Sequence, residues 1–259
     1  MPVVFKRRDV WKPGARTVGE NRAISNKILL VLPFWNGDRT QMMLLARLIA
    51  DLETSHSEIA DVLFVARFDT QHDLATVEHV SRKFNVLTHT SLHREVGWPH
   101  GCNGLTTGVL DFLVSPRNRV LHYKAVLICE ADCIPLARDW ISRLCQQRDS
   151  VSGVKIAGAL ISAGGREHIN GGCCFLSGDS DFLLWLHKCI QRGPSAGWDW
   201  ALAGELQTKG WANIPTIWSH WRSGSKNIEA VRALMAAGVL LFHGVNDASG
   251  AESVRAVLL

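Results

Sequence analysis

The feature that most constrains the fold of this chain is a series of short apolar runs that alternate with helical patterns. In the first half, four runs are almost free of polar residues, as expected of strands buried on both faces of a sheet: 27–33, 60–68, 85–88 and 124–129. The segments between them space their apolar residues for one helix face, which predicts helices near 45–52, 74–83 and 105–113. Asp38 or Thr40 is expected to cap the first helix. Short junctions between these elements predict an α/β fold with a mainly parallel central sheet flanked by helices.

The second half has a mixed pattern. Strands are expected at 154–160, 173–176, 212–218 and 239–243, and helices at 181–190, 199–209 and 228–237. Two Gly-Gly pairs lie in the segment 164–172. At 259 residues, the chain is long for one core and short for two, so we expect one domain at 27–259.

Composition excludes several classes of protein. A hydrophobic fraction of 47% and a charged fraction of 20% exclude a disordered chain. No apolar stretch reaches the ~18 residues of a membrane span, and no signal sequence is recognisable, so a cytoplasmic protein is expected. The seven cysteines form no Cys-x-x-Cys pair, which favours reduced thiols over a zinc site.

Positive charge is concentrated at the N-terminus. Residues 1–27 carry a net charge of +5, whereas the whole chain carries +4. A basic arm at 1–26 would suit a polyanionic partner such as nucleic acid. A solubilising tail without a partner explains the same charges equally well.

The most informative motif is Glu130-Ala131-Asp132, directly after the apolar run 124–129. Along an extended chain, the i, i+2 spacing places both carboxylates on one side, where they repel each other unless a cation lies between them. Manganese or magnesium would fit because hard divalent cations bind carboxylates and phosphates together. Alternatively, Asp132 caps a helix that starts near 136.

Three further segments carry candidate functional residues. Gly171-Gly172 would let a backbone approach a ligand closely, or would form a bulge or a turn. Asp199, between Trp198 and Trp200, is a candidate general base or a helix N-cap. His243, after an apolar run, is a candidate metal ligand and favours manganese over magnesium, although a histidine in such a place is often an ordinary terminal residue.

Taken in this order, the motifs resemble those of the GT-A glycosyltransferases over nearly the whole chain. The resemblance implies a Rossmann-like nucleotide-binding half at 27–135 and an acceptor-binding half at 136–259. It implies that Glu130, Asp132 and His243 hold Mn²⁺ (or Mg²⁺) and that Asp199 is the catalytic base of an inverting transfer. The expected binding residues for a nucleotide-sugar, with a UDP-sugar favoured, are Pro33, Trp35, Asn36, Arg67, Asp69, Trp98, Pro99, Asn103, Ala131, Gly171 and Gly172. The expected acceptor-binding residues are Trp198, Trp200 and Trp221.

This chain departs from the family pattern in two places. Its acidic motif begins with Glu130 instead of an aspartate, and Asp199 has tryptophans on both sides where the usual pattern has a second acid. Both departures bear on the roles of single residues more than on the fold.

The resemblance leaves the acceptor open. The size of the chain is similar to that of phage enzymes that glycosylate hydroxymethylated DNA bases, and the basic arm and the ten tryptophans suit a base in DNA. Such an enzyme would act in the host cytoplasm. A transferase of cell-surface polysaccharide synthesis is the competing interpretation, since a basic arm can also face anionic lipid. A nucleotidyltransferase and a non-catalytic nucleic-acid-binding module are the alternatives outside glycosyl transfer.

Overall fold

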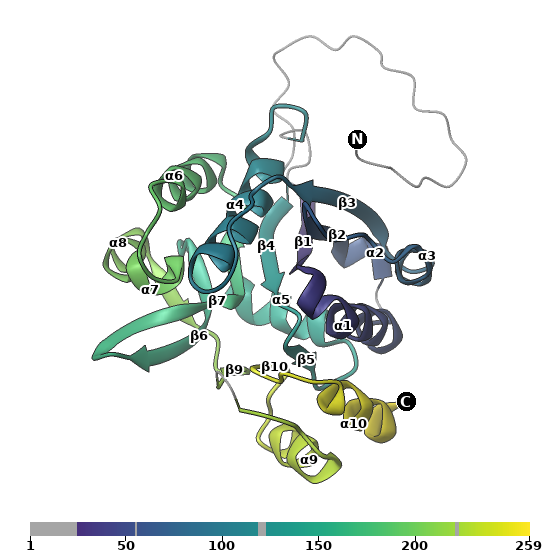
Figure 1. The fold of residues 1–259 in the computed structure, drawn as a ribbon. Helices are drawn as coiled ribbons and strands as arrows, with labels where there is room; N and C mark the ends of the chain where they lie inside the picture. The colour runs from purple at the N-terminus through teal and green to yellow at the C-terminus, as the bar shows by residue number, and fades with distance from the viewer. Residues whose placement is uncertain (1–24, 55, 119–122, 221–222) are drawn as a thin grey trace.

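The computed structural model describes residues 25–54, 56–118, 123–220 and 223–259. A seven-stranded sheet with the order β3-β2-β1-β4-β7-β6-β8 forms the centre, and a three-stranded sheet with the order β5-β10-β9 lies below it (Figure 1). The α/β class and the mainly parallel central sheet predicted from the sequence are therefore confirmed.

The first half of the chain supplies four parallel strands. They are β1 (Ser25–Phe34), β2 (Ala60–Arg67), β3 (Asn85–Ser91) and β4 (Tyr123–Cys129). The connecting helices are η1 (Asn36–Asp38), α1 (Arg39–Leu52), α2 (His56–Ile59), α3 (Leu74–Ser81) and α4 (His100–Val114). Because β2 and β4 both pair with β1, the chain turns in opposite directions after β1 and after β3, and this arrangement opens a crevice at the carboxyl ends of the strands.

The second half extends the same sheet and adds the small one. β7 (Arg166–Ser177) pairs antiparallel with β4 and with β6 (Ile156–Ala163), and β6 pairs with β8 (Trp211–Asn213). In the small sheet, β10 (Leu241–His243) lies between β5 (Cys133–Pro135) and β9 (Ile217–Ser219). The helices are α5 (Trp140–Ser150), α6 (Ser180–Gln191), α7 (Trp198–Ala201), α8 (Ala203–Lys209), α9 (Ile228–Ala236) and α10 (Ser249–Leu258).

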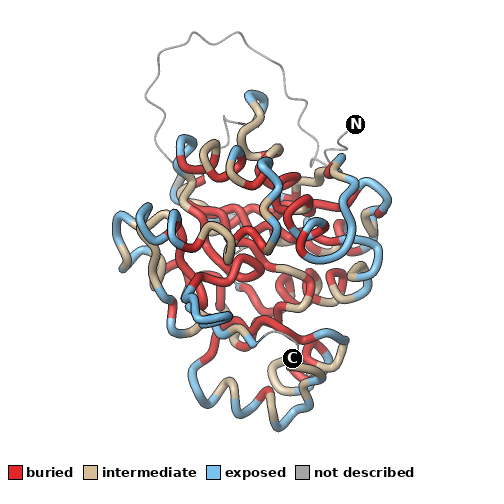
Figure 2. Tube along the Cα trace, turned by 60° about the vertical axis from the view of Figure 1, so that its left-hand side comes forward, coloured by how far each residue is buried: buried red, intermediate tan, exposed pale blue. Residues whose placement is uncertain are grey.

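Two apolar clusters cover the two faces of the central sheet. Successive residues of β1 point to opposite faces, so Leu30 and Leu32 join one cluster while Leu29 and Val31 join the other. The first cluster includes residues of α1, α5 and α10, and the second includes residues of α4 and α6. The buried trace runs through the middle of the molecule, with exposed segments outside it (Figure 2).

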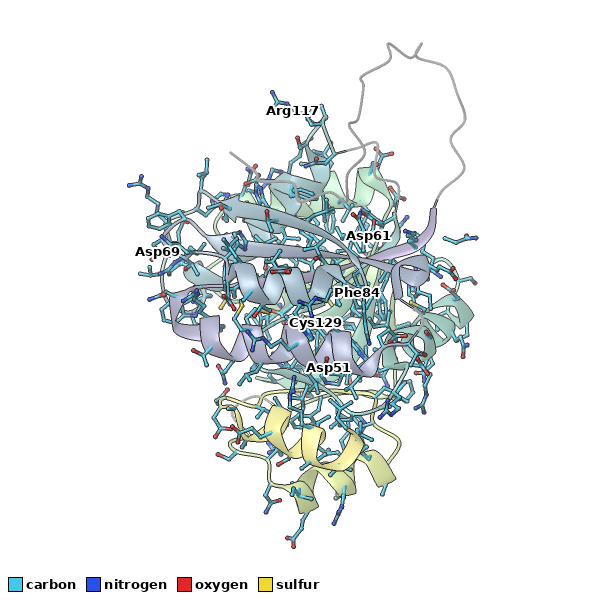
Figure 3. All side chains as sticks on the ribbon, turned by 90° about the vertical axis from the view of Figure 1, so that its right-hand side faces the viewer. Asp51, Asp61, Asp69, Phe84, Arg117 and Cys129 are labelled. Carbon is cyan, nitrogen blue, oxygen red and sulfur yellow. The ribbon has the colours of Figure 1, made fainter. Side chains whose placement is uncertain are left out.

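The two ends of β2 differ in their polar contacts. At the amino end, buried Asp61 accepts hydrogen bonds from Tyr123 Oη at 2.8 Å and from Lys27 Nζ and Asn85 Nδ2, both at 3.2 Å. Asp69 lies just past the opposite end of the strand (Figure 3). The strand starts are therefore tied together by a buried network, while the carboxyl edge carries the candidate site.

Helix α4 begins five residues before the predicted start at 105. Gly101 and Gly104 suggested a loop, but together with Gly108 they recur at helical spacing and face one neighbouring segment. A Cβ on Gly101 would lie 3.1 Å from the carbonyl carbon of Val96, and one on Gly104 would lie 3.2 Å from Glu95 Oε2. The glycines therefore allow the helix to pack closely against the segment after β3.

Two predictions for the second half were wrong. The helix predicted at 199–209 is divided at Leu202 into α7 and α8, which bury Trp198 and Leu206 respectively. The strand predicted at 212–218 is divided at Pro215, which cannot donate to a ladder. β5 and α10 were not predicted.

Among the described residues, no helix has the length and apolarity that a membrane span requires.

Candidate active site

Glu130 and Asp132 lie in a tight turn between β4 and β5, at the carboxyl edge of the central sheet. The Glu130 N–H donates to the Gly172 carbonyl of β7 at 2.9 Å. The carbonyl of Asp132 accepts from the N–H groups of Gly244 and Val245 at 3.1 and 3.0 Å. The backbone of the acidic motif is thus held by β7 on one side and by the segment after β10 on the other.

The small sheet brings His243 to the acidic motif. Because β10 pairs antiparallel with β5, His243 lies opposite Cys133, next to Asp132. Its Nε2 is 3.1 Å from Asp132 Oδ1 and 3.4 Å from Glu130 Oε2. One ligand atom from each of the three residues can be chosen so that all lie within 4.8 Å of one another.

The electrostatics of this cluster suit a cation. Burial disfavours the charged form of His243, but the neighbouring Asp132 and Glu130 carboxylates outweigh burial and raise its pKa well above the ordinary value. Asp132 Oδ1 is buried, and its close partner among the described residues is His243 Nε2 at 3.1 Å. A buried carboxylate oxygen is costly unless it has a positive partner.

Gly172 keeps the space beside the cluster open. A Cβ at this position would collide with Glu130 Oε2 and would lie 2.6 Å from His243 Nε2. The backbone of β7 therefore passes closer to the two side chains than any other residue would permit. Two carboxylates, one imidazole and this clearance fit a hard divalent cation, which Glu130, Asp132 and His243 would hold.

A cleft of about 560 Å³ opens beside the acidic motif. Five of the expected nucleotide-sugar-binding residues line it: Pro33, Trp35, Arg67, Trp98 and Ala131. Glu130 and Asp132 line it too, so the cleft joins the predicted donor residues to two of the predicted metal ligands. Trp35 and Trp98 are 41% and 65% exposed, which leaves ring surface free to stack on a ligand.

Arg67 also lines the cleft and brings a positive charge to it. Its guanidinium donates to both carboxylate oxygens of Asp69, at 2.8 and 2.5 Å, and lies 5.1 Å from the centre of the Trp35 ring. The hydrogen bond to Arg67 lowers the pKa of Asp69. Asp69 therefore orients Arg67 and is not itself part of the lining.

The remaining expected donor residues lie outside the cleft lining. Asn36 and Pro99 are next to lining residues in the chain. The side-chain amide of buried Asn103 is hydrogen-bonded to the backbone: Nδ2 donates to the Ala196 carbonyl and Oδ1 accepts from the Trp198 N–H, both at 2.9 Å. Asn103 thus holds the segment before α7, while Gly171 and Gly172 lie behind the acidic motif on β7.

Asp199 is held by two backbone N–H groups. Its Oδ2 accepts from Gly171 at 2.8 Å and its Oδ1 accepts from Trp200 at 2.9 Å. Gly197, not Asp199, occupies the N-cap position of α7, so the N-cap interpretation of Asp199 is wrong. The alternative for Asp132 is also wrong, because β5 follows it and the next helix begins at Trp140.

The tryptophans expected at the acceptor differ in their environments. Trp198 is 4% exposed and packs against Gly171, where a Cβ would lie 2.7 Å from the indole. Trp200 is half-buried, has the guanidinium of Arg166 4.8 Å from its ring centre, and donates from Nε1 to the Ala163 carbonyl at 3.2 Å. Trp221 lies outside the described residues.

Asp38, which the sequence offered as a cap of the first helix, also lines the cleft. It occupies the N-cap position of α1 without a side-chain hydrogen bond to the helix. Burial, reinforced by the charges of Glu130 and Asp132, raises its pKa to about 6. Asp38 lies near the acidic motif because it follows β1, which pairs in parallel with β4, the strand before Glu130.

Cys102 shows how the acids are distributed. This cysteine of α4 lines the cleft, and its pKa is raised to about 12 by burial and then by the charges of Glu130, Asp38, Asp199 and Asp132. Three of these carboxylates, those of Asp38, Glu130 and Asp132, line the cleft, and Asp199 acts on Cys102 from outside the lining. Such an environment attracts cations.

No protein-family model and no curated protein sequence matches this chain. Among solved structures, the galactosyltransferase LgtC in complex with donor and acceptor sugar analogues is similar, with a TM-score of 0.57 at 10% identity over 88% of this chain and 94% of that one. Mouse xyloside xylosyltransferase 1 gives a TM-score of 0.50 at 11% identity over 84% of this chain and 97% of that one. The bifunctional glycosyltransferase WbbM gives 0.51 at 11% identity over 86% of this chain and 46% of that one. These similarities show that the fold is that of GT-A-type glycosyltransferases.

Proposed function

We propose that this chain is a metal-dependent glycosyltransferase that moves a sugar from a nucleotide-diphosphate-sugar, with a UDP-sugar as the favoured donor, to a hydroxyl acceptor. The observation that carries the proposal is the position of Glu130, Asp132 and His243. Their ligand atoms lie within 4.8 Å of one another at the carboxyl edge of a nucleotide-binding type of sheet, and both acids line a cleft.

The donor would bind along this cleft. Trp35 and Trp98 offer exposed ring surface to the nucleoside, and Arg67 supplies a positive charge in the lining. Glu130, Asp132 and His243 would hold manganese (or magnesium), which supplies positive charge to the diphosphate when it is bound. Since Asp38 adds another carboxylate to the lining, the cleft repels a diphosphate when no cation is present.

The acceptor hydroxyl would be deprotonated by Asp199. Its two oxygens are oriented by the N–H groups of Gly171 and Trp200, and each oxygen keeps a further lone pair for a substrate proton. The charge of Asp199 contributes to the raised pKa of Cys102, which lines the cleft. This supports a position of Asp199 beside the donor sugar. In this proposal, residues 27–135 bind the nucleotide and residues 136–259 contribute the base and the acceptor contacts.

For the acceptor itself, we propose a hydroxymethylated base in DNA. The support comes from the cations of residues 1–27 and from half-buried Trp200 beside Asp199, whereas Trp198 is buried and offers no surface to a base. Incubation with labelled nucleotide-sugars and with hydroxymethylated or unmodified DNA tests this step. Label on the modified DNA alone is the expected result. Label on a saccharide acceptor but on neither DNA would leave the transferase proposal intact and replace DNA by a polysaccharide acceptor.

The transferase proposal is tested by the release of nucleoside diphosphate from a panel of nucleotide-sugars, with and without Mn²⁺. We expect release that requires the metal and that Asp132→Asn abolishes in a folded protein. Asp181→Asn is the matched control, because Asp181 is an exposed aspartate at the start of α6. Release of pyrophosphate from nucleoside triphosphates would instead indicate a nucleotidyltransferase. Nucleic-acid binding that ignores both manganese and nucleotide-sugars would indicate a binding module.

A further inference from the structure

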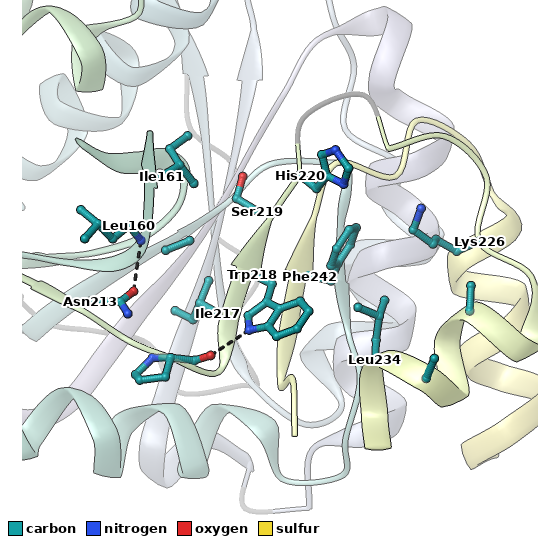
Figure 4. Close-up of a pocket in the computed structure, with 14 residues that line it drawn as sticks. Leu160, Ile161, Asn213, Ile217, Trp218, Ser219, His220, Lys226, Leu234 and Phe242 are labelled. Carbon is teal, nitrogen blue, oxygen red and sulfur yellow. Dashed lines mark hydrogen bonds between the residues drawn. The ribbon is translucent and has the colours of Figure 1, made fainter. Parts of the chain in front are cut away.

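A second cavity of about 560 Å³ lies between β6, the small sheet and α9 (Figure 4). Its lining shares no residue with the lining of the donor cleft. Trp218 and Phe242 are paired across β9 and β10 and point into it from the same face of the small sheet. Because side chains alternate along β10, His243 points to the opposite face. Trp218 and Phe242 thus point away from the metal cluster, and the lining residue Ser219, whose Oγ is 3.0 Å from His243 Nδ1, is where the cavity adjoins it.

The body of this cavity is apolar. Trp218 is 45% exposed, and its indole N–H is already used by the Pro215 carbonyl at 2.9 Å, so the cavity receives the apolar ring. Ile217 and Leu234 add aliphatic surface, and the small side chains of Ala230 and Ala233 on α9 leave space in the cavity. A large aromatic surface that remains exposed beside aliphatic walls favours an apolar ligand.

One end of the cavity is positively charged. Lys226 lies in the lining, with its ammonium 5.4 Å from the centre of the Phe242 ring and 2.9 Å from the Ser223 carbonyl. No described residue of the lining carries a carboxylate. The pKa of Asp247 is lowered by hydrogen bonds from Ser225 and Ser249 and, to a smaller extent, by the charge of Lys226. Asp247 does not line the cavity. The ammonium therefore keeps donor capacity for an anionic group of a ligand.

We infer that this cavity binds an amphiphilic anion, whose alkyl or aromatic body packs on Trp218, Phe242 and Leu234 and whose phosphate or carboxylate group meets Lys226. A neutral sugar fits less well, because the middle of the cavity offers ring and methyl surface instead of the hydrogen-bonding groups that sugar hydroxyls need. A nucleotide fits less well, because Lys226 is the only formally charged side chain among the described lining residues.

Octyl phosphate, kept below its micellar concentration, is a suitable probe. Calorimetry should show saturable binding that remains when the donor cleft is filled with UDP and Mn²⁺. Octyl glucoside and octyltrimethylammonium carry the same chain with a neutral and a positive head group, and both should bind at least about tenfold more weakly, the scale of a charge-assisted hydrogen bond. The binding test needs no glycosyltransferase activity, so it stands apart from the proposed function.

Two pairs of variants locate the binding. Ala233→Trp should fill the cavity and abolish binding, whereas Ala236→Trp, at an exposed position of α9 outside the lining, should leave it unchanged. Lys226→Gln should weaken octyl phosphate about tenfold without affecting octyl glucoside, and Arg232→Gln, also exposed on α9, should change neither.

Three results would overturn the inference. They are equal affinity for the three head groups, competition between octyl phosphate and UDP with Mn²⁺, and binding that survives Ala233→Trp in a protein with unchanged thermal stability.

Discussion

Ser219 Oγ lies 3.0 Å from Nδ1 of His243, on the side of the imidazole away from Asp132 and Glu130. The two residues are paired across β9 and β10, so the small sheet itself fixes their contact. For Nε2 to offer a lone pair to a cation, Nδ1 must carry the proton and donate it to the hydroxyl. The Ser219 hydroxyl can accept this proton, so the contact is compatible with the tautomer of His243 that a metal site needs.

The first prediction follows from this contact. Ser219→Ala should weaken Mn²⁺ binding about 10-fold, at the lower end of the effect of residues that orient a metal ligand. Titration of Mn²⁺ followed by electron paramagnetic resonance measures the affinity directly. Ser219→Thr, which keeps the hydroxyl, should restore most of it. Equal affinities of wild type and Ser219→Ala would contradict the role of this hydrogen bond.

The second prediction concerns Gly172. Gly172→Ala places a methyl group against Glu130 Oε2 and 2.6 Å from His243 Nε2, so the two side chains must move apart. Mn²⁺ affinity should fall by at least about 100-fold, a loss of about 2.7 kcal/mol, while the secondary structure is retained. Calorimetric Mn²⁺ titration and circular dichroism check the two parts of this expectation.

Gly204 of α8 provides the matched control for Gly172. A Cβ at Gly204 would meet nothing within 4 Å, and the residue lies in a helix. Gly204→Ala should therefore leave Mn²⁺ affinity unchanged and should raise the thermal stability slightly. If both alanine variants bound Mn²⁺ like the wild type, the clearance beside the cluster would have no function in metal binding.

The third prediction is a pH dependence that arises at Asp38. Its pKa in the folded protein, about 6, is above the value of 3.8 expected in the unfolded chain, because burial and then Glu130 and Asp132 disfavour its charge. Its contribution to stability is thus present below pH 3.8 and is lost as the pH rises through about 6. Without metal, Asp38→Asn should raise the melting temperature above pH 6 and have little effect near pH 4.

Asp73 supplies the opposite sign as a control. A hydrogen bond from Thr76 lowers its pKa below 3.8. Its contribution to stability is therefore present above that pH and is lost as the pH falls. Asp73→Asn should accordingly lower the melting temperature near neutral pH. A difference between Asp38→Asn and wild type that does not change with pH would show that Asp38 is not held in an unfavourable charged state.

Strand signals in the first half of the sequence were strong because β1, β2 and β4 are buried on both faces, whereas the edge strand β3 is partly exposed. The apolar run at 124–129 has no other stable place than the middle of a sheet, and it became β4. The order of motifs was enough to bring Glu130, Asp132 and His243 to one place. Their use as metal ligands remains a prediction.

Other features were harder to predict because they depend on contacts between segments that are distant in the sequence. Gly101 and Gly104 look like turn formers, yet they serve the contact of α4 with the segment after β3. The break at Leu202 depends on which side chains the finished sheet can bury, and this is not encoded in local propensity. Asp38 looked like a helix cap, since its neighbours Glu130 and Asp132 are distant in the sequence.

The last prediction distinguishes catalysis at Asp199 from a structural role. Asp199 accepts hydrogen bonds from the Gly171 and Trp200 N–H groups, and an asparagine can still accept one of them, so Asp199→Asn should fold. As a general base it should contribute about 10²- to 10⁴-fold to sugar transfer. We therefore expect Asp199→Asn to lose transfer by that factor in kcat while the KM for the nucleotide-sugar stays nearly unchanged.

The matched comparison for Asp199 is Asn103→Ala. Asn103 holds the segment before α7 through Ala196 and Trp198 and touches neither acid of the cluster. Its loss should lower the melting temperature and reduce transfer only through displacement of α7, so the pH profile of kcat should keep its shape. In Asp199→Asn, by contrast, the acidic limb of that profile should disappear, because the group that must be deprotonated is gone. An Asp199→Asn enzyme with normal kcat and an unchanged acidic limb would assign the base to another residue.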